Sequence, residues 1–510
     1  MLKCYRRGCF AAQIVLSTLL SCWLTVFERQ ANAQVVREHQ YNLETGTLGA
    51  TGQTPFWLRA NQYGIVPLDG PVQRFQAGLR ANYRPADSTG HRPKVDWGYT
   101  IDAVANVGVT TQLLLPEAHV KARLGAFELY AGRRREVVGL VDTLLTTGAY
   151  IWSGNALPIP KIQFGLYQYT SVPFTKGIVS VLGAFAHGWF ENQGRIVKGS
   201  YLHQKYLYGR LGKPTWPFRL YAGFNHQVIW GGYAPPGVLD PRLAVDGRLP
   251  TGLHYYSAVV LGLRGQWNRA DPNVTSMEDN RIGNHLGSVD LGADVNLSHW
   301  NLYLYRQFLY DDGSLFYGTN LADGLNGLRL KNRRQPAGEP FFLRQITLEF
   351  LFTESQGGSD FVIDDPDLRG RDDYFNHSQF IDGWTYNGRT IGTPFFTTAR
   401  EARPSLPTRT GIVNNRVSVG NIGLSALVNG ALNLTTRLSL SRNLGTYSIP
   451  YPSAPMQFSG LFSAALPVRL LGGTMLSGSV GVDVGGLLPN SVGVYVGLRK
   501  TGLLNRAVPY

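Results

Sequence analysis

Hydrophobic and polar residues alternate one by one along much of this chain. Phe75, Ala77 and Leu79, for example, alternate with Gln76 and Arg80. The same period of two recurs at residues 97–107, 118–124, 218–224, 289–297, 346–352, 437–441 and 492–498. Such a period places one apolar and one polar face on a β-strand. The pattern therefore predicts an all-β fold, with Val104 as an apolar exception on a polar face.

Two all-β architectures produce this alternation. In a soluble sandwich the apolar faces point inward, whereas in a membrane barrel they point outward to lipid. The sequence offers about 16 to 18 candidate strands of roughly ten residues, which suits a barrel wide enough to enclose a lumen. After Ala33 no apolar stretch is long enough for a transmembrane helix. We therefore predict a transmembrane antiparallel β-barrel with a polar lumen.

The first 33 residues have the pattern of a secretory signal peptide. Basic residues near the start precede an apolar stretch from Phe10 to Phe27, and Ala31 to Ala33 forms an A-x-A cleavage site. A membrane-anchoring helix and a lipoprotein signal ending at Cys22 are the alternatives. We expect a signal peptide at 1–33 and an outer-membrane barrel at 34–510, located in the cell outer membrane.

All three cysteines lie inside the signal segment, so the mature chain would have neither a disulfide nor a cysteine metal site. The formal net charge of the whole chain is +14. The longest basic run is the three residues Arg133 to Arg135, so nucleic-acid binding has little support. The positive balance reflects either general solubility or attraction to an anionic partner.

Three stretches interrupt the alternation, at residues 137–161, 231–255 and 354–411. They are rich in glycine, proline and polar residues, which do not extend a strand ladder. Long irregular stretches in a barrel are loops that fold over or into the mouth, and such loops often carry function. The long irregular loop region 354–411 is the strongest candidate for a binding site.

Outward apolar faces would leave a lumen lined with charged residues. The lumen residues expected are Arg80, Asp102, His119, Lys121, Arg123, Arg219, Arg264, Asp290, Asp294, Glu349, Arg437 and Arg499. They would form either a solvated, salt-bridged interior or a basic wall that attracts acidic sugars through arginine forks. The alternation alone does not decide between these two interpretations.

Residues 354–411 combine aromatic rings with planar polar groups, as sugar-binding sites do. Packing that merely closes the mouth would use the same residues. The candidate polysaccharide-binding residues are Trp384, Tyr386, Arg389, Tyr374, Asn376 and His377 in this region, with Asn155, Lys161, Lys121 and Arg123 elsewhere. Trp384 and Tyr386 are the strongest candidates for a sugar-stacking surface.

Acidic residues offer two further interpretations. Asp364, Asp365, Asp367, Asp372 and Asp373 could bind calcium or could be ordinary turn residues, and the turn interpretation is favoured. A glycosidase acid pair could come from these residues or from Glu278 and Asp279, but such a pair depends on a separation that the sequence does not give. Hydrolase triad, zinc-protease, phosphate-loop and dinucleotide motifs are lacking. We expect neither a metal nor a cofactor.

Several short motifs resemble the capsule-assembly protein Wzi family. They are Gly52 to Trp57, Asn61 to Gly64, Asn155 to Lys161, Ala186 to Trp189, Trp230 to Gly232, Asp279 to His285, Asp373 to His377 and Gly383 to Phe395. Their order and number make the resemblance specific, although each motif alone is weak. Two departures are that no periplasmic helical bundle can be placed, and that the last strand pattern stops near Arg499.

The resemblance implies an outer-membrane barrel of about 18 strands, within the size range of such barrels. It also implies a lectin-like, non-catalytic role, in which a monomer retains capsular or other exported polysaccharide at the cell surface. The expected partners are that polysaccharide, acidic if the basic wall binds it, and outer-membrane lipid. The alternatives are a channel for sugars or anions and a glycan hydrolase.

Overall fold

The computed structural model separates the chain into two units. One is the barrel, Glu38–Tyr83 with Lys94–Arg506; the described part of the other includes a turn in which His91 N donates to Asp87 Oδ1. The residues that the structure describes are 37–87, 90–263, 271–275, 281–311, 315, 318–360 and 370–504. The predicted signal peptide, Arg264, Glu278, Asp279 and three of the acidic residues with a calcium or a turn interpretation, Asp364, Asp365 and Asp367, lie outside this set.

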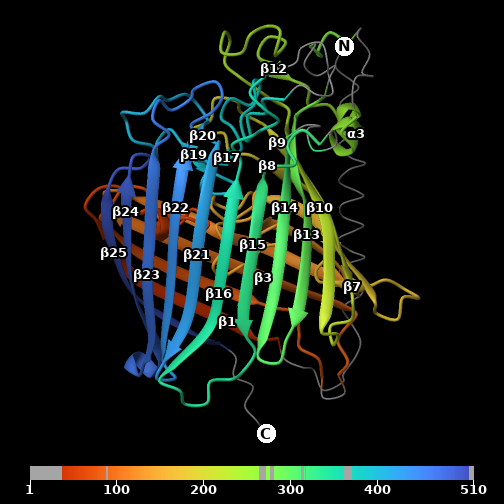
Figure 1. The fold of residues 1–510 in the computed structure, drawn as a ribbon. Helices are drawn as coiled ribbons and strands as arrows, with labels where there is room; N and C mark the ends of the chain where they lie inside the picture. Colours follow the sequence, from red (N-terminus) through yellow and green to blue (C-terminus); the bar gives the residue numbers. More distant parts are fainter. Residues whose placement is uncertain are drawn as a thin grey trace, which may run out of the picture. The chain divides into compact units, whose positions relative to one another are not determined.

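The barrel wall is a closed antiparallel sheet of 18 strands, as the sequence predicts (Figure 1). The wall strands are β1 (His39–Ala50), β2 (Val72–Ala81), β3 (Val95–Gly108), β4 (Gln112–Leu124), β5 (Phe127–Arg133), β6 (Lys161–Leu166), β8 (Val179–Trp189), β9 (Tyr201–Leu211), β10 (Phe218–Trp230), β13 (Asn284–Asn296), β14 (Trp300–Asp311), β15 (Gly324–Asn332), β16 (Phe341–Phe352), β21 (Val417–Val428), β22 (Leu432–Asn443), β23 (Met456–Val468), β24 (Thr474–Gly485) and β25 (Ser491–Leu503). Each pairs with its neighbours along the chain, and β1 pairs with β25 to close the ring. Strand β7 (Thr170–Ser171) adds a two-residue pairing to β8.

The apolar faces of the strands point outward. Phe75, Ile101 and Val120 are about half exposed, whereas the alternating Gln76 and Asp102 are buried. This orientation confirms the predicted period of two at each of the stretches named above. The exceptional Val104 faces inward and is fully buried in the core of the lumen, next to a register shift between β3 and β4. The last strand continues to Leu503, beyond the predicted end near Arg499.

The two ends of the barrel differ in their connections. Most connections at one end are long: 51–71, 134–160, 190–200, 231–283, 312–323, 353–416 and 444–455. Those at the other end are mostly short, for example 125–126, 297–299 and 429–431. The first strand begins and the last strand finishes at this second end, since Gln40 pairs with Leu503. We call the two ends the long-loop end and the short-turn end.

The long connections contain a few short elements. They are α2 (Phe56–Arg59), β11 (Gly232–Tyr233), β12 (Arg248–Leu249), α3 (Leu253–Leu261), β17 (Thr385–Tyr386), β18 (Arg389–Thr390), β19 (Thr397–Thr398) and β20 (Ile412–Asn414); the single turn η1 (Leu470–Gly472) lies at the short-turn end. No helix among the described residues is both long and apolar enough to cross a membrane.

Helix α3 is a short helix in the connection between β10 and β13, and the period-two pattern does not predict it. Its residues are mostly apolar all round, so no amphipathic period marks it. It packs through Tyr255, Ala258 and Val259 against Val228 and Trp230, which occupy outward positions on β10. The helix therefore shields part of the outer wall near the long-loop end.

Candidate functional site

Three long loops, the residues 51–71, 134–160 and the described part of 353–416, fill the lumen at the long-loop end. We call them together the plug. Its centre is aromatic: the ring centroids of Tyr150 and Phe375 are 5.0 Å apart, and those of Phe375 and Phe396 are 4.7 Å apart. All three side chains are fully buried. The inward face of the wall is polar as predicted, and loop side chains fill the space inside it at this end.

Polar side chains on the wall bind the backbone of the plug. Asp290 on β13 accepts a hydrogen bond from Leu140 N at 2.8 Å, and Gln307 on β14 accepts one from Tyr150 N at 2.9 Å. Glu349 on β16 accepts the amide of Thr147. Buried backbone groups need such partners, because water is excluded from the core. The alternating polar face of the strands is therefore what allows irregular loops to enter the lumen.

The loop 51–71 is held in the same way by other strands of the ring. Phe56 N donates to Asp483 on β24 at 2.8 Å. The indole Nε1 of Trp57 donates to Ser439 Oγ on β22 at 3.0 Å, and the side chain is fully buried. Asn106 on β3 donates to the carbonyl of Ile65 at 2.9 Å. Strands from much of the ring therefore contribute to fixing the plug.

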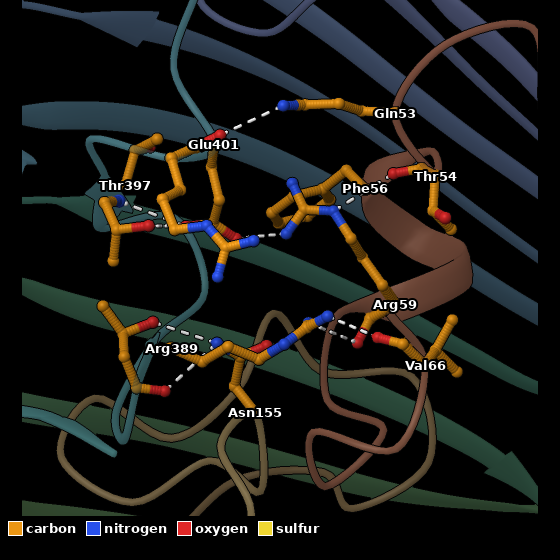
Figure 2. A network of polar contacts seen from close by, with 12 residues as sticks. Gln53, Thr54, Phe56, Arg59, Val66, Asn155, Arg389, Thr397 and Glu401 are labelled. Carbon is orange, nitrogen blue, oxygen red and sulfur yellow. Dashed lines mark hydrogen bonds and ion pairs between the residues drawn. The ribbon is translucent and has the colours of Figure 1, made fainter. Parts of the chain in front are cut away.

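A buried charged network joins two plug loops (Figure 2). The guanidinium of Arg59 on α2 pairs with Glu401 and donates through Nε to Thr54 O at 3.1 Å. Arg389 on β18 donates to the carbonyls of Arg59 and Val66. Burial opposes the charged form of Glu401, but Arg59 and Arg389 together hold the pKa of this carboxyl below its usual value. Burial, with Arg59 nearby, lowers the pKa of Arg389 to about 10.

A cleft of about 750 Å³ opens where the plug meets the loop 190–200. We call it the mouth cleft. Its polar lining residues are Asp69, Glu191, Gln193, Arg195, Asp382, Asn387, Arg389, Arg400, Glu401 and Arg409. Arg400 is largely exposed, with its nearest carboxylate oxygen, on Asp69, 3.8 Å away. The cleft therefore offers guanidinium, amide and carboxylate groups to a ligand.

Some groups in the mouth cleft already have structural partners. Asp382 accepts the amides of Ile196 and Val197, at 3.0 and 2.9 Å. Glu191 accepts Asn387 N at 2.8 Å, and burial raises the pKa of the Glu191 carboxyl. The side chain of Asn387 itself is exposed. Asn387 and Arg400 are therefore well placed to meet a ligand without loss of the loop structure.

The structure places the predicted aromatic residues inside the plug and away from the surface. Trp384 is fully buried, packs against Trp152 and Phe190, and donates through Nε1 to Ile151 O at 3.0 Å. Tyr386 and Tyr374 are also buried. The alternative interpretation, that these rings pack the mouth closed, accounts for their positions. Glycan binding by them stays a prediction.

The remaining predicted residues lie in several places. Asn155 is buried and donates to Thr390 Oγ1 at 2.9 Å, while Asn376 donates to Asp373 Oδ1 at 2.9 Å. The backbone amide of Gln379 donates a hydrogen bond to Nδ1 of His377. These three contacts stabilise loop conformations. Arg389 is the predicted residue that lines the mouth cleft.

The basic residues predicted on other strands are not brought together with Trp384. Lys161 is buried at the start of β6 and pairs with Glu136 at 2.7 Å. Lys121 and Arg123 lie near the short-turn end of β4, where both contact the ring of Tyr83. The ten predicted residues therefore do not form one site.

Sequence reasoning missed several mouth-cleft residues, including Glu191, Gln193, Arg195 and Arg400. The polar run Glu191 to Arg195 directly follows the motif Ala186 to Trp189, so it could have been recognised as a loop at a strand end. Asp69 and Arg400 are far apart in the sequence and carry no comparable signal. Among the described residues, no group of three or more potential ligands is arranged to hold a metal ion.

The closed ring of antiparallel strands with outward apolar side chains defines an outer-membrane type of β-barrel. Among solved structures, the fold is similar to that of Wzi from Escherichia coli, an outer-membrane protein involved in group 1 capsule assembly and described as a carbohydrate-binding β-barrel. The TM-score is 0.56 at 13% identity, over 96% of this chain and 88% of that chain. The fold thus agrees with the resemblance to the Wzi family that the sequence motifs indicate.

Two Pseudomonas aeruginosa barrels are similar at a lower level. OccK5 has a TM-score of 0.45 at 9% identity, covering 92% of this chain and 99% of its own. OpdL has a TM-score of 0.45 at 10% identity, covering 92% of this chain and all of its own. No family model matches the sequence, and no curated protein matches it.

Proposed function

We propose that this chain is a non-catalytic outer-membrane protein of the Wzi type that binds and retains exported polysaccharide at the cell surface. The observation that carries the proposal is the plug. A lumen filled by buried aromatic side chains and fixed to several strands is suited to presenting a surface. The fold similarity to a carbohydrate-binding barrel supports the same function.

The ends of the barrel support an orientation. Bacterial barrels have short periplasmic turns and longer extracellular loops. By this rule the short-turn end faces the periplasm and the long-loop end, with the mouth cleft, faces the outside. A polysaccharide leaving the cell would meet the mouth cleft at the outer surface.

The chemistry of the mouth cleft fits a saccharide with acidic groups. Arg400 provides a planar donor for carboxylates, and Asn387 provides an amide for hydroxyl groups. The predicted aromatic residues are buried below the cleft. Affinity would therefore come from hydrogen bonds and charge, and we expect it to weaken as salt increases.

The experiment combines Asn387→Gly with Arg400→Gln. Asn387 has a φ of 50°, which glycine adopts without strain, so the double variant should fold. We expect it to retain about tenfold less polysaccharide on intact cells, for the loss of two polar contacts. The matched control is Arg334→Gln, which removes a half-exposed arginine at the short-turn end.

Unchanged retention by a double variant that still reaches the outer membrane would contradict binding in the mouth cleft. The same assay tests the hydrolase alternative by measuring the length of the polysaccharide. Shortening that stops in Glu191→Gln would contradict the non-catalytic proposal. The channel alternative is tested by conductance, as described in the Discussion.

A further inference from the structure

A second cavity lies on the other side of the plug, inside the short-turn half of the barrel. Its volume is about 870 Å³, and Gln62 and Tyr63 of the plug line one side of it. We call it the vestibule. Inward-facing residues of its walls are Gln40, Asn42 and Glu44 on β1, Arg74 and Arg80 on β2, Asp102 on β3 and Arg499 on β25. The mouth cleft shares none of these residues.

Three acidic residues line the vestibule, and each has an arginine within ion-pair distance; Glu117 on β4 is 3.9 Å from Nη1 of Arg135. Glu44 pairs with Arg74 and also accepts the hydroxyl of Tyr495 at 2.7 Å. Asp102 pairs with Arg135 at 2.5 Å, and Gln76 donates to the same carboxylate at 2.8 Å. These contacts use the carboxylates and their nearest cations together. The cavity lining thus has three carboxylates and four arginines, and its excess of positive charge lies with the remaining basic residues.

Two of those basic residues, Arg80 and Arg499, have no carboxylate within ion-pair distance among the residues that the structure describes. Arg80 Nε donates to Gln40 Oε1 at 2.8 Å, and its two terminal nitrogens have no hydrogen-bond partner among the same residues. Both side chains are exposed although their strand positions face inward, so the exposure is toward the lumen. A guanidinium is always charged and presents a planar fork that fits a carboxylate.

A third group also points to a ligand. The side-chain Oδ1 of Asn42 is buried at the wall and has no hydrogen-bond partner among the described residues. A buried acceptor without a donor costs free energy, which a ligand hydroxyl would recover. Asn42 lies on β1, the strand that is paired with both β2 and β25. An acceptor for hydroxyls therefore lies on the strand between those carrying the two free guanidinium groups.

We propose that the vestibule is a separate binding site for an acidic oligosaccharide, with Arg80 and Arg499 binding sugar carboxylates and Asn42 accepting a hydroxyl hydrogen bond. Low-dielectric walls focus the field of unpaired charges in a narrow cavity. The assignment rests on the geometry of the lumen and does not require the mouth cleft to bind. Under the orientation proposed above, the site faces the periplasm and would meet polysaccharide before it reaches the surface.

The test uses the purified full chain in detergent, with oligogalacturonate of three to five sugars as the probe and isothermal titration calorimetry. Neutral malto-oligosaccharide of the same length and inorganic phosphate are the comparison ligands. Arg80→Gln with Arg499→Gln should weaken oligogalacturonate binding at least about tenfold, since two charge-assisted contacts are lost. Arg80→Lys with Arg499→Lys keeps the charge without the fork and should give an intermediate loss.

The variants of the mouth cleft separate the two sites. If the vestibule binds acidic sugar, the Asn387→Gly, Arg400→Gln chain still binds oligogalacturonate in the vestibule. The vestibule variants lose this binding. Equal affinity for the neutral oligosaccharide, equal affinity for phosphate, or unchanged binding in both vestibule variants would each overturn the proposal. If the Asn387→Gly, Arg400→Gln chain retains polysaccharide on cells as well as the parent does, the proposal of binding in the mouth cleft fails. That outcome leaves the result for the vestibule unaffected.

Discussion

The two halves of the lumen have the same kind of polar wall, but one half is filled by the plug and the other contains a cavity. At the long-loop end, polar wall residues such as Asp290 and Glu349 are bound to the plug backbone and buried. At the short-turn end, Arg80 and Arg499 face open space. The difference shows that an inward polar residue can have either of two roles. The nearby loop, more than the residue type, decides whether it supports packing or meets solvent and ligands.

The largest expected effect comes from removing an aromatic side chain at the centre of the plug. Trp384→Ala should lower the free energy of unfolding by about 3 to 5 kcal/mol, because it leaves a large cavity in a packed core. Urea unfolding of the detergent-folded protein measures this loss. Trp216→Ala, at an exposed position of the short-turn end, is the matched control and should change stability by less than about 1 kcal/mol.

An equal loss in both tryptophan variants would contradict the claim that the long-loop half of the lumen is a packed core. Arg80→Gln adds a control inside the lumen. Because its side chain is exposed and makes no ion pair with any described residue, we expect a change within about 0.5 kcal/mol.

The next largest effect comes from the wall that holds the plug. Glu349 accepts hydrogen bonds from Thr146 Oγ1 and Tyr305 OH, each at 2.6 Å, and from the amide of Thr147. Glu349→Ala leaves these buried donors unpaired and should cost about 2 to 4 kcal/mol. We also expect larger and more frequent current steps in planar bilayers than in the parent protein, because the plug is released from β16.

Glu349→Gln is the matched variant, since its amide oxygen can still accept from the plug. It should remain close to the parent in conductance. A parent protein that already conducts like an open porin would contradict the filled lumen and favour the channel alternative.

The smallest of the three effects depends on pH. Arg59 and Arg389 hold the pKa of Glu401 below its ordinary value of 4.5 in the folded state. A carboxyl with a lowered folded pKa stabilises the fold above its unfolded pKa and loses this contribution as pH falls toward the folded value. Glu401→Gln should therefore cost about 2 kcal/mol at pH 7, for one charged contact of a buried arginine.

Unfolding of both chains at pH values from 7 to 3 checks this expectation. The stability gap between the parent and Glu401→Gln should narrow below about pH 5, where the unfolded carboxyl takes up a proton. A gap that stays constant, or widens, would show that the Arg59–Glu401 ion pair does not stabilise the plug. Thr54→Ala provides a control in the same network, since its carbonyl contact with Arg59 is retained.

The sequence predicted the wall better than the site. The alternation in 75–83 and 492–498 identified strands β2 and β25. It did so because outward residues of a strand all meet an apolar environment, whereas inward residues meet a polar one. The interruption of the alternation at 354–411 predicts a long loop region there. Its aromatic residues Trp384 and Tyr386 could not be placed, because stacking on a sugar and packing in a core require the same side chains. Only contacts with Ile151 and Phe190 distinguish the two.

The sequence by itself determined the strands and their two faces, because strand periodicity is local and appears within about ten residues. The tertiary structure decided what fills the lumen. Arg59 meets Glu401, and Asp290 meets Leu140, across separations that no local pattern encodes. Loop entry converts some inward polar residues into buried hydrogen-bond partners and leaves Arg80 and Arg499 facing a cavity. This division follows from ring closure and loop packing, which depend on contacts between distant parts of the chain.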